Sequence, residues 1–182
     1  MGMVAKMDKA LYGAAQWYAA QVLTGDELQT VQALEDAGFN AIAPMERRME
    51  RKGGRLYERT HIYLPGYVFV RTGMDAATYY AIRAANGSLR LLGTRASGDH
   101  WPTPIPPAQM RLLMALWAHG RAGKPANVVR NANGTTELCP GPLTDAGARI
   151  VRVDRRAGRA TIAARVLDKT CQATIMIHYT GE

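Results

Sequence analysis

Short apolar runs and one helical repeat alternate along the first quarter of the chain. The aromatic and apolar run from Trp17 to Leu23 has the length and composition of a buried strand. Thr24 and Glu27 have the spacing of a capping box, which predicts the start of a helix, and Gly38 is a typical residue just past a helix end. A helix is therefore predicted between Thr24 and Gly38. A second strand is predicted from Phe39 to Pro44. The helix would bury an apolar stripe of Leu28, Val31 and Leu34.

The next segment is first highly charged and then strongly apolar. Residues 46–60 contain six Arg or Lys and three Glu around Gly53-Gly54, a dipeptide that suits the positive φ angles of a tight hairpin. We therefore predict an exposed, basic hairpin arm. Pro65-Gly66 marks a turn, and Tyr67 to Val70 reads as a core strand. Alternation along that strand predicts one face in the core and the other open to a partner.

Two further helices are predicted before the chain becomes poor in apolar residues. Asp75 is a suitable N-cap for a helix from Ala76 to about Ala85, and a short strand is predicted from Ser88 to Gly93. Pro107 is well placed to begin another helix, which Gly120 would end. The apolar face of that helix would comprise Met110, Leu113, Met114 and Trp117.

The last third of the chain has the pattern of a linker followed by a small β-domain. Residues 121–136 are mainly Gly, Asn, Thr and Ala with little apolar content, which is typical of a flexible linker. Three β-branched runs with turn signals between them then indicate a barrel. These runs are Arg149–Val153, Ala160–Val166 and Ala173–His178.

The predicted fold is α+β. It combines an N-terminal α/β sandwich, with a mainly antiparallel four-stranded sheet and flanking helices, a flexible linker and a small C-terminal β-barrel. The expected boundaries are a disordered lead-in at 1–16, an N-terminal domain at 17–120, the linker at 121–136 and the barrel domain at 137–182.

Charge and motif content narrow the class of function. A formal net charge of +8 and a pI of about 9.8 favour a polyanionic partner. The longest uncharged run, between Lys9 and Asp26, is too short for a transmembrane helix, so no membrane association is predicted. Cys139 and Cys171 suit a reduced cytoplasmic protein. No metal, phosphate-loop, dinucleotide or nucleophile motif appears. We therefore predict a binding protein with no catalytic residue, metal or cofactor.

Several motifs together point to a known family. They are Trp17-Tyr18 at the start of a strand, Ala43-Pro44-Met45, the Gly-Gly basic hairpin and the block Leu-Pro-Gly-Tyr-Val-Phe-Val from Leu64 to Val70. In this order they resemble the N-terminal domain of the NusG transcription-elongation family. Gly141-Pro142-Leu143 and Ile150–Asp154 are similar to the start of that family's KOW module, which is an SH3-like barrel.

The resemblance implies a surface for RNA polymerase. In NusG-like proteins, an aromatic cluster around this turn grips the clamp helices of the large polymerase subunit. The alternative, that the aromatic side chains fill the core, is expected for about half of them from strand alternation. The matching positions are Gln21, Tyr63, Leu64, Tyr67 and Phe69.

The resemblance also implies nucleic-acid contacts in both halves of the chain. The helix after the main strand and the basic arm would meet non-template DNA, through Tyr79, Tyr80, Arg83, Arg51 and Arg55. The KOW module would meet RNA, such as a nascent hairpin, through Arg152, Arg155, Arg156, Arg159, Arg165 and Lys169. Three alternatives stay open: the tyrosines fill the core, the charged arm is only solvated, and the basic KOW turn is only solvated.

The expected function is that of a bacterial elongation and antitermination factor, a cytoplasmic monomer that binds polymerase and promotes processive readthrough. Ala43-Pro44-Met45 and the Arg-rich KOW turn look more like specialised paralogues of the LoaP and RfaH type. Two alternatives stay open. One is a general elongation factor that links polymerase to Rho or to the ribosome, and the other is a translation-associated KOW protein that binds RNA.

Overall fold

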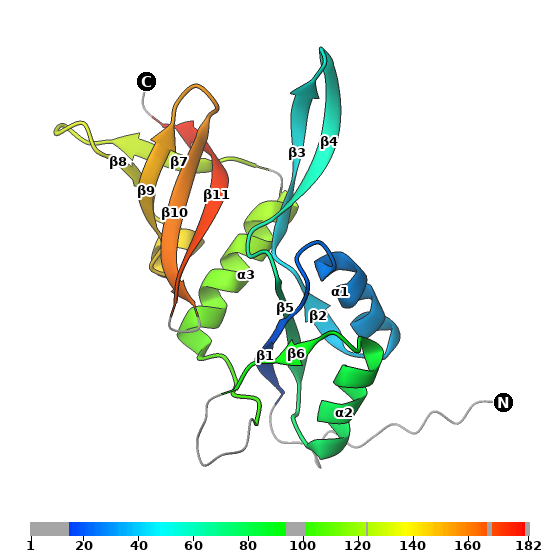
Figure 1. Ribbon diagram of the computed structural model, residues 1–182. Helices are drawn as coiled ribbons and strands as arrows, with labels where there is room; N and C mark the ends of the chain where they lie inside the picture. The colour runs from blue at the N-terminus through cyan, green and yellow to red at the C-terminus, as the bar shows by residue number, and fades with distance from the viewer. Residues whose placement is uncertain (1–14, 94–100, 123, 167–168, 181–182) are drawn as a thin grey trace. The chain divides into compact units, whose positions relative to one another are not determined.

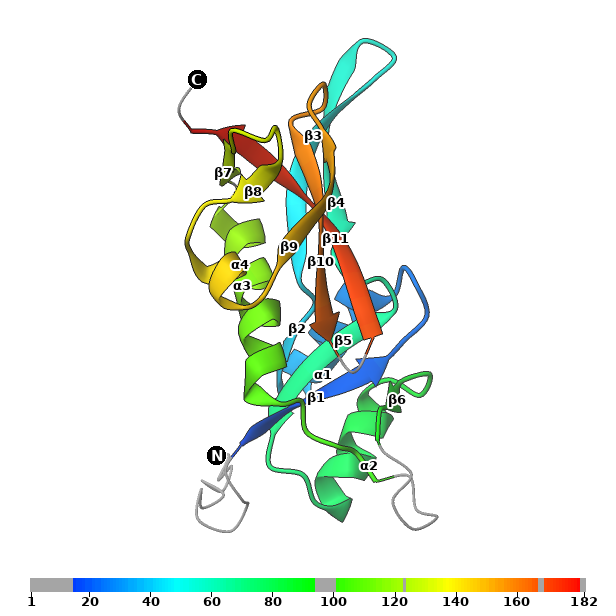
Figure 2. The same ribbon diagram turned by 90° about the vertical axis from the view of Figure 1, so that its left-hand side faces the viewer.

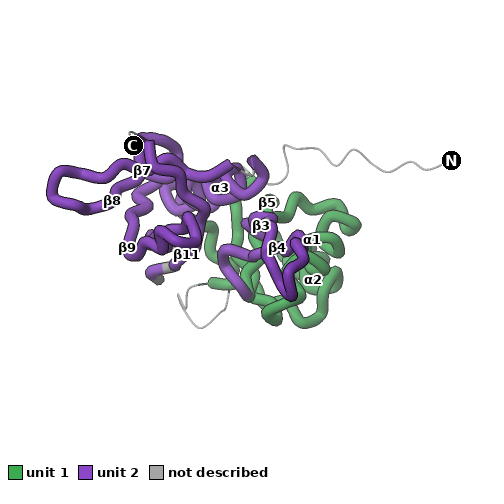
Figure 3. The backbone as a smooth tube through the Cα atoms, turned by 90° about the horizontal axis from the view of Figure 1, so that it is seen from above, with its two compact units in different colours: residues 1–42, 66–105 green, residues 43–65, 106–182 purple. Residues whose placement is uncertain are grey.

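A computed structural model describes residues 15–93, 101–122, 124–166 and 169–180 (Figure 1). The predicted lead-in lies almost entirely outside these residues. The chain divides into two compact units, drawn in separate colours in Figure 3. Unit 1 comprises residues 1–42 and 66–105, and unit 2 comprises residues 43–65 and 106–182.

Unit 1 is built on a four-stranded sheet in the order β2-β5-β1-β6, in which every pair of neighbours is antiparallel. Helices α1 and α2 cover one face, where Leu34 and Ile82 pack with Val68 and Val70. Phe69 is also fully buried, so both faces of the central strand are covered, whereas strand alternation alone predicted one open face. The elements are β1 (Gln16–Gln21), α1 (Glu27–Asp36), β2 (Asn40–Ile42), β5 (Tyr67–Thr72), α2 (Ala76–Ala85) and β6 (Arg90–Leu91).

The start of α2 is as predicted, and the start of α1 is not. Asp75 caps α2 by accepting a hydrogen bond from the backbone N–H of Thr78 at 2.7 Å, which lowers the pKa of the Asp75 carboxyl. Asp26, rather than Thr24, is the N-cap of α1, and no side chain caps that helix. The Glu27 carboxylate points into the protein instead, and Glu27 is only 2% exposed. The buried face of α1 is therefore rotated toward Glu27, Thr30 and Leu34, and Leu28 is exposed.

The basic arm of unit 2 is confirmed as a hairpin. Strands β3 (Met45–Lys52) and β4 (Arg55–Ile62) pair antiparallel (Figure 1). Residues 51–60 are all exposed. Gly53 and Gly54 form the turn with φ angles of 57° and 79°, which are accessible to glycine at little cost.

Helix α3 (Pro107–Ala122) begins where predicted but continues past Gly120. A Cβ atom at this position would overlap the carbonyl oxygen of Met45 in β3. Gly120 therefore serves the close approach of helix and strand rather than a helix end. The buried residues of α3 are Met110, Leu112, Leu113, Ala115 and Leu116. Met114, which was predicted to belong to the apolar face, is 40% exposed and lies outside it.

His119, near the end of α3, gives the protein an acid-sensitive group. Burial lowers the pKa of its imidazole below the ordinary value of 6.5, and its Nε2 atom has no hydrogen-bond partner among the described residues. Below pH 6.5 the unfolded chain therefore binds a proton that the folded chain does not, and stability decreases as the pH falls.

We expect His119→Gln to reduce the loss of unfolding free energy between pH 7.5 and 5.5, because the neutral amide does not titrate. Urea unfolding at the two pH values measures this loss. His178→Gln, at an exposed position on β11, is the matched control and should leave the loss unchanged. An equal effect of both substitutions would contradict the assignment.

The remainder of unit 2 is a small barrel. Its sheet has the order β8-β7-β11-β10-β9, and the two edge strands lie against each other so that it nearly closes (Figures 1 and 2). Val128, Ile162 and Ile175 fill its interior. The elements are β7 (Ala126–Arg130), β8 (Thr136–Leu138), α4 (Pro142–Asp145), β9 (Arg149–Asp154), β10 (Arg159–Val166) and β11 (Lys169–Tyr179).

The α+β fold class, with its four-stranded antiparallel sheet and C-terminal barrel, is confirmed. The segment expected to be a linker differs, because it contains β7. That strand pairs in parallel with β11 and buries Val128 completely. The predicted domain boundaries remain a prediction. None of the helices in the described ranges is long and apolar enough to cross a membrane.

Candidate functional site

The turn before β5 is held by one buried carboxylate. The backbone N–H of Gly66 donates to Glu27 Oε1 at 2.7 Å, and the N–H of Gly25 donates to Oε2 at 2.8 Å. The N–H of Val22 in turn donates to the carbonyl oxygen of Gly66 at 3.0 Å. Gly66 has a φ of +82°, a conformation that favours glycine. The start of β5 is thus tied both to β1 and to α1.

Two of the five expected polymerase-binding residues lie together beside this turn. Gln21, the last residue of β1, is the cross-strand partner of Tyr67, the first residue of β5. Directly opposed side chains in an antiparallel pair share a face of the sheet. Gln21 is exposed and Tyr67 is half-buried. This pair therefore offers an amide and a phenol to a partner, on a rigid strand pair.

The other three residues are buried. Phe69, on β5 of unit 1, is fully buried. Within unit 2, the Tyr63 hydroxyl donates to Glu46 Oε2 at 2.8 Å, and Leu64 lines a small cavity. Other residues around that cavity are Leu112 and Leu116 of α3 and Ile162 and Ala173 of the barrel. These side chains contribute packing rather than contact area in this structure.

An aromatic surface lies on α2 and the segment after it. The rings of Tyr79 and Trp101 are stacked, with centroids 5.8 Å apart and planes at 25°. Tyr80 packs edge-on against Tyr79 at 5.4 Å, and the Arg83 guanidinium carbon lies 5.8 Å from the Tyr79 centroid. The three expected DNA-binding residues of α2 are therefore brought together, and Trp101 joins them. Sequence reasoning missed Trp101 because it stands alone in a proline-rich segment without periodicity.

The two expected DNA-binding residues of the arm are separated. Cross-strand pairing places Arg51 opposite Leu56 and Lys52 opposite Arg55, so Arg51 and Arg55 lie on opposite faces of the hairpin. The Arg55 face also holds Glu50, whose carboxylate lies 2.8 Å from His61 Nε2 and 3.6 Å from Arg59. The Arg51 face carries the exposed apolar residues Met49 and Leu56.

Four of the six expected RNA-binding residues gather at one end of the barrel. Arg152, Arg155 and Arg156 are exposed on β9 and in the turn after it, and Arg159 begins β10. The Asp154 carboxylate accepts a hydrogen bond from the N–H of Ala157 at 3.0 Å and orders this turn. Arg165 lies six residue steps along β10 from Arg159, which is about 20 Å of strand. The backbones of Arg165 and Lys169 therefore lie at the opposite end of β10, away from the other four residues.

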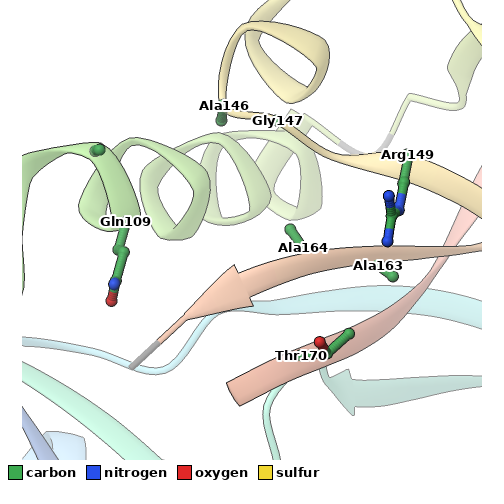
Figure 4. A pocket seen from close by; sticks show the side chains of 8 residues that line it. Gln109, Ala146, Gly147, Arg149, Ala163, Ala164 and Thr170 are labelled. Atoms are coloured by element: carbon green, nitrogen blue, oxygen red, sulfur yellow. The ribbon is translucent and has the colours of Figure 1, made fainter. Parts of the chain in front are cut away.

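A pocket of about 420 Å³ in unit 2 lies between the start of α3 and the barrel (Figure 4). Small residues make up most of its lining, with Gln109, Arg149 and Thr170 as the larger polar ones. Among the described residues that line it, none carries a carboxylate, an imidazole or a thiol. In the part of the chain that the structure describes, no three His, Cys, Asp or Glu residues come together to hold a metal ion.

Comparison with known proteins supports the family resemblance. The protein-family model NusG, transcription termination factor nusG, matches residues 15–114, just over half of the chain. The transcription termination/antitermination protein NusG of Staphylococcus carnosus (strain TM300) is 27% identical over 111 residues, covering 56% of this chain and 60% of that protein. NusG of Staphylococcus aureus (strain Mu50 / ATCC 700699) is 26% identical with the same coverage, 56% and 60%. The chain thus spans about 60% of the length of these curated relatives.

The fold also matches a solved structure. The structure on domain interaction in Thermotoga maritima NusG superposes with a TM-score of 0.58 at 18% identity, covering 89% of this chain and 93% of that one. The matched family residues include β1, the Glu27-held turn, β5 and α2. With more than half of its residues matched in this way, the chain belongs to the NusG family.

Proposed function

We propose that this protein is a transcription elongation and antitermination factor that binds the clamp helices of RNA polymerase through its N-terminal part and promotes processive readthrough. The observation that carries the proposal is the family match over residues 15–114, which contain the Glu27-held turn. A binding role, rather than catalysis, also agrees with membership of a family of transcription termination factors. The protein would act in the cytoplasm, where bacterial polymerase works, as a monomer without a cofactor.

The polymerase contact would centre on Gln21 and Tyr67. These two residues share a face of the β1–β5 pair and retain exposed surface, whereas Leu64 and Phe69 are buried. Tyrosine is enriched at interface hot spots because it brings a large, rigid contact area and a hydroxyl that can hydrogen-bond. The carboxylate of Glu27 would keep the adjoining turn in one conformation before binding, which reduces the entropy lost on association.

Nucleic acid would be the second partner. The α2 surface, together with Arg51 or Arg55 on the arm, would meet non-template DNA, and the arginine turn of the barrel would meet nascent RNA. Arg155 and Arg156 are exposed and lie next to each other on a glycine-containing turn, an arrangement that suits RNA phosphates. Arg165 and Lys169, at the opposite end of β10, would add at most a second site.

Binding to purified core polymerase tests the proposal. The double variant Gln21→Ala, Tyr67→Ala should lose at least tenfold in affinity, because truncating a hot-spot tyrosine typically costs about 2 kcal/mol. Arg71→Ala, exposed near the other end of β5, is the matched control and should bind as the unchanged protein does. Absence of binding by the unchanged protein would refute the proposal.

Terminator readthrough separates the family's general and specialised roles. A specialised antiterminator of the LoaP or RfaH type would need an upstream leader, and Arg155→Ala with Arg156→Ala would abolish its effect. If readthrough needs neither the leader nor the two arginines, this result would favour a general elongation factor whose barrel contacts Rho or the ribosome. A translation-associated KOW protein would bind RNA and leave polymerase unbound.

A further inference from the structure

We propose that Trp101 stacks on an unpaired base of single-stranded nucleic acid and that Tyr79 is the residue that positions it. This inference rests on the proposed function, which assigns non-template DNA to the α2 surface, and it adds the residue that meets the base and the residue that positions it. Trp101 is not among the residues that the sequence pattern assigned to nucleic acid, and it reaches the surface from the segment after β6.

The ring contacts divide this surface into support and contact residues. Tyr79 is half-buried, and its ring packs against Trp101, Tyr80 and Arg83. Trp101 is stacked on one side by Tyr79 and is still 48% exposed. We infer that this exposed part includes the second face of the indole, on which another aromatic ring can stack. Trp101, rather than Tyr79, is therefore the residue that a base would meet.

The backbone holds Trp101 in place. Gly93 and Pro102 form a β-bridge, and a Cβ atom at Gly93 would overlap the carbonyl oxygen of Trp101. The N–H of Thr103 donates to the carbonyl oxygen of Leu92 at 3.1 Å, and the N–H of Ile105 donates to Trp17 at 2.7 Å. The segment that carries Trp101 is thus fastened to the sheet, so the indole is presented with little loss of freedom on binding.

The chemistry of the surroundings favours nucleic acid. Residues 76–93 contain Arg83 and Arg90 and no Asp or Glu, while Asp75 precedes this range and Asp99 stands two residues before Trp101 in the sequence. Tyr80, at 67% exposure, offers a second ring next to Arg83. Exposed aromatic rings beside arginine bind single strands because every base has a face to stack and every nucleotide a phosphate to neutralise. A duplex keeps its bases stacked internally and offers no free face to Trp101.

Intrinsic fluorescence of the full chain tests the assignment. The variant Trp17→Phe, Trp117→Phe retains Trp101 as its single tryptophan. Titration with a single-stranded oligo(dT) should quench this emission, and a duplex of the same length should not. The matched protein, in which Trp101→Phe is the sole change, retains Trp17 and Trp117 and should show no quenching.

Affinity for the oligonucleotide separates contact from positioning. Trp101→Ala should weaken binding about 5- to 150-fold, which corresponds to 1–3 kcal/mol for one stacked base, whereas Trp101→Phe should weaken it only slightly. Tyr79→Leu should weaken binding and shift the Trp101 emission to the red, because the indole loses its support. Tyr79→Phe keeps the ring and should do neither.

Several results would overturn the proposal. Equal quenching by the single strand and by the duplex would show that the surface binds phosphates rather than bases. If Trp101→Ala bound the oligonucleotide as tightly as the unchanged protein, Trp101 would not belong to the site. Loss of polymerase binding in Trp101→Ala without quenching would assign the ring to a protein contact. The polymerase-binding assay tests the proposed function separately. If oligo(dT) quenches the Trp101 emission and polymerase does not bind, the proposed function is refuted and the assignment of Trp101 is retained.

Discussion

Glu27→Gln is expected to lower the free energy of unfolding by about 3 kcal/mol, because the buried carboxylate accepts two backbone hydrogen bonds, each worth about 1.5–3 kcal/mol. In the amide, one of the two oxygens becomes an NH₂ group that faces a backbone N–H. The affected donors are Gly66 at 2.7 Å and Gly25 at 2.8 Å. Urea unfolding at pH 7 measures the loss.

Glu35→Gln is the matched control for this substitution. Glu35 lies on the same helix and is exposed, so its replacement should change the free energy of unfolding by less than about 0.5 kcal/mol. A loss below about 1 kcal/mol for Glu27→Gln would show that the turn is held by other contacts. Where the variant is still folded, we also expect weaker polymerase binding, since Tyr67 directly follows the turn.

Gly120→Ala should destabilise the protein by about 3 kcal/mol, the opposite sign to the usual effect of this change. Alanine in place of glycine inside a helix normally gains about 1 kcal/mol. At this position the added methyl group would overlap the carbonyl oxygen of Met45, and it would lie 2.7 Å from the carbonyl carbon. Helix α3 or strand β3 must move to accommodate it. Thermal and urea unfolding both report the change.

Gly87→Ala provides the comparison for Gly120→Ala. A Cβ atom at Gly87 meets nothing within 4 Å, so this substitution should be neutral or slightly stabilising. If Gly120→Ala stabilised the protein as it would an isolated helix, the close packing of α3 on β3 would be refuted. A selective loss of order at the arm would instead support it, because β3 leads directly into the hairpin.

The elements that were predicted well are those whose signals are local. Asp75 caps the helix that it precedes, and Gly53-Gly54 forms the hairpin turn between two strands that pair with each other. The β-branched runs at β9, β10 and β11 needed only their own composition. Each of these signals acts within a few residues, so the sequence order already contains it.

The features that sequence reasoning missed depend on residues far apart in the chain. Glu27 was read as part of a capping box, and its carboxylate instead reaches Gly66, 39 residues away. Gly120 was read as a helix end, and its role is set by Met45. The strand β7 was read as linker, because its two valines stand in a polar segment and its pairing with β11 joins residues about 50 positions apart. For the candidate site, the same limit hid Trp101, whose stacking on Tyr79 joins two segments.

The amino-acid sequence by itself determined the α+β class, the basic arm, the C-terminal barrel and the family, because periodicity, turn residues and the Leu64–Val70 block are all properties of short segments. Only the tertiary structure decided which site residues face solvent. It buried Phe69, paired Gln21 with Tyr67, separated Arg51 from Arg55 and brought Trp101 to Tyr79. The physical reason is that exposure and contact depend on strand register and packing, which are set by the whole chain at once.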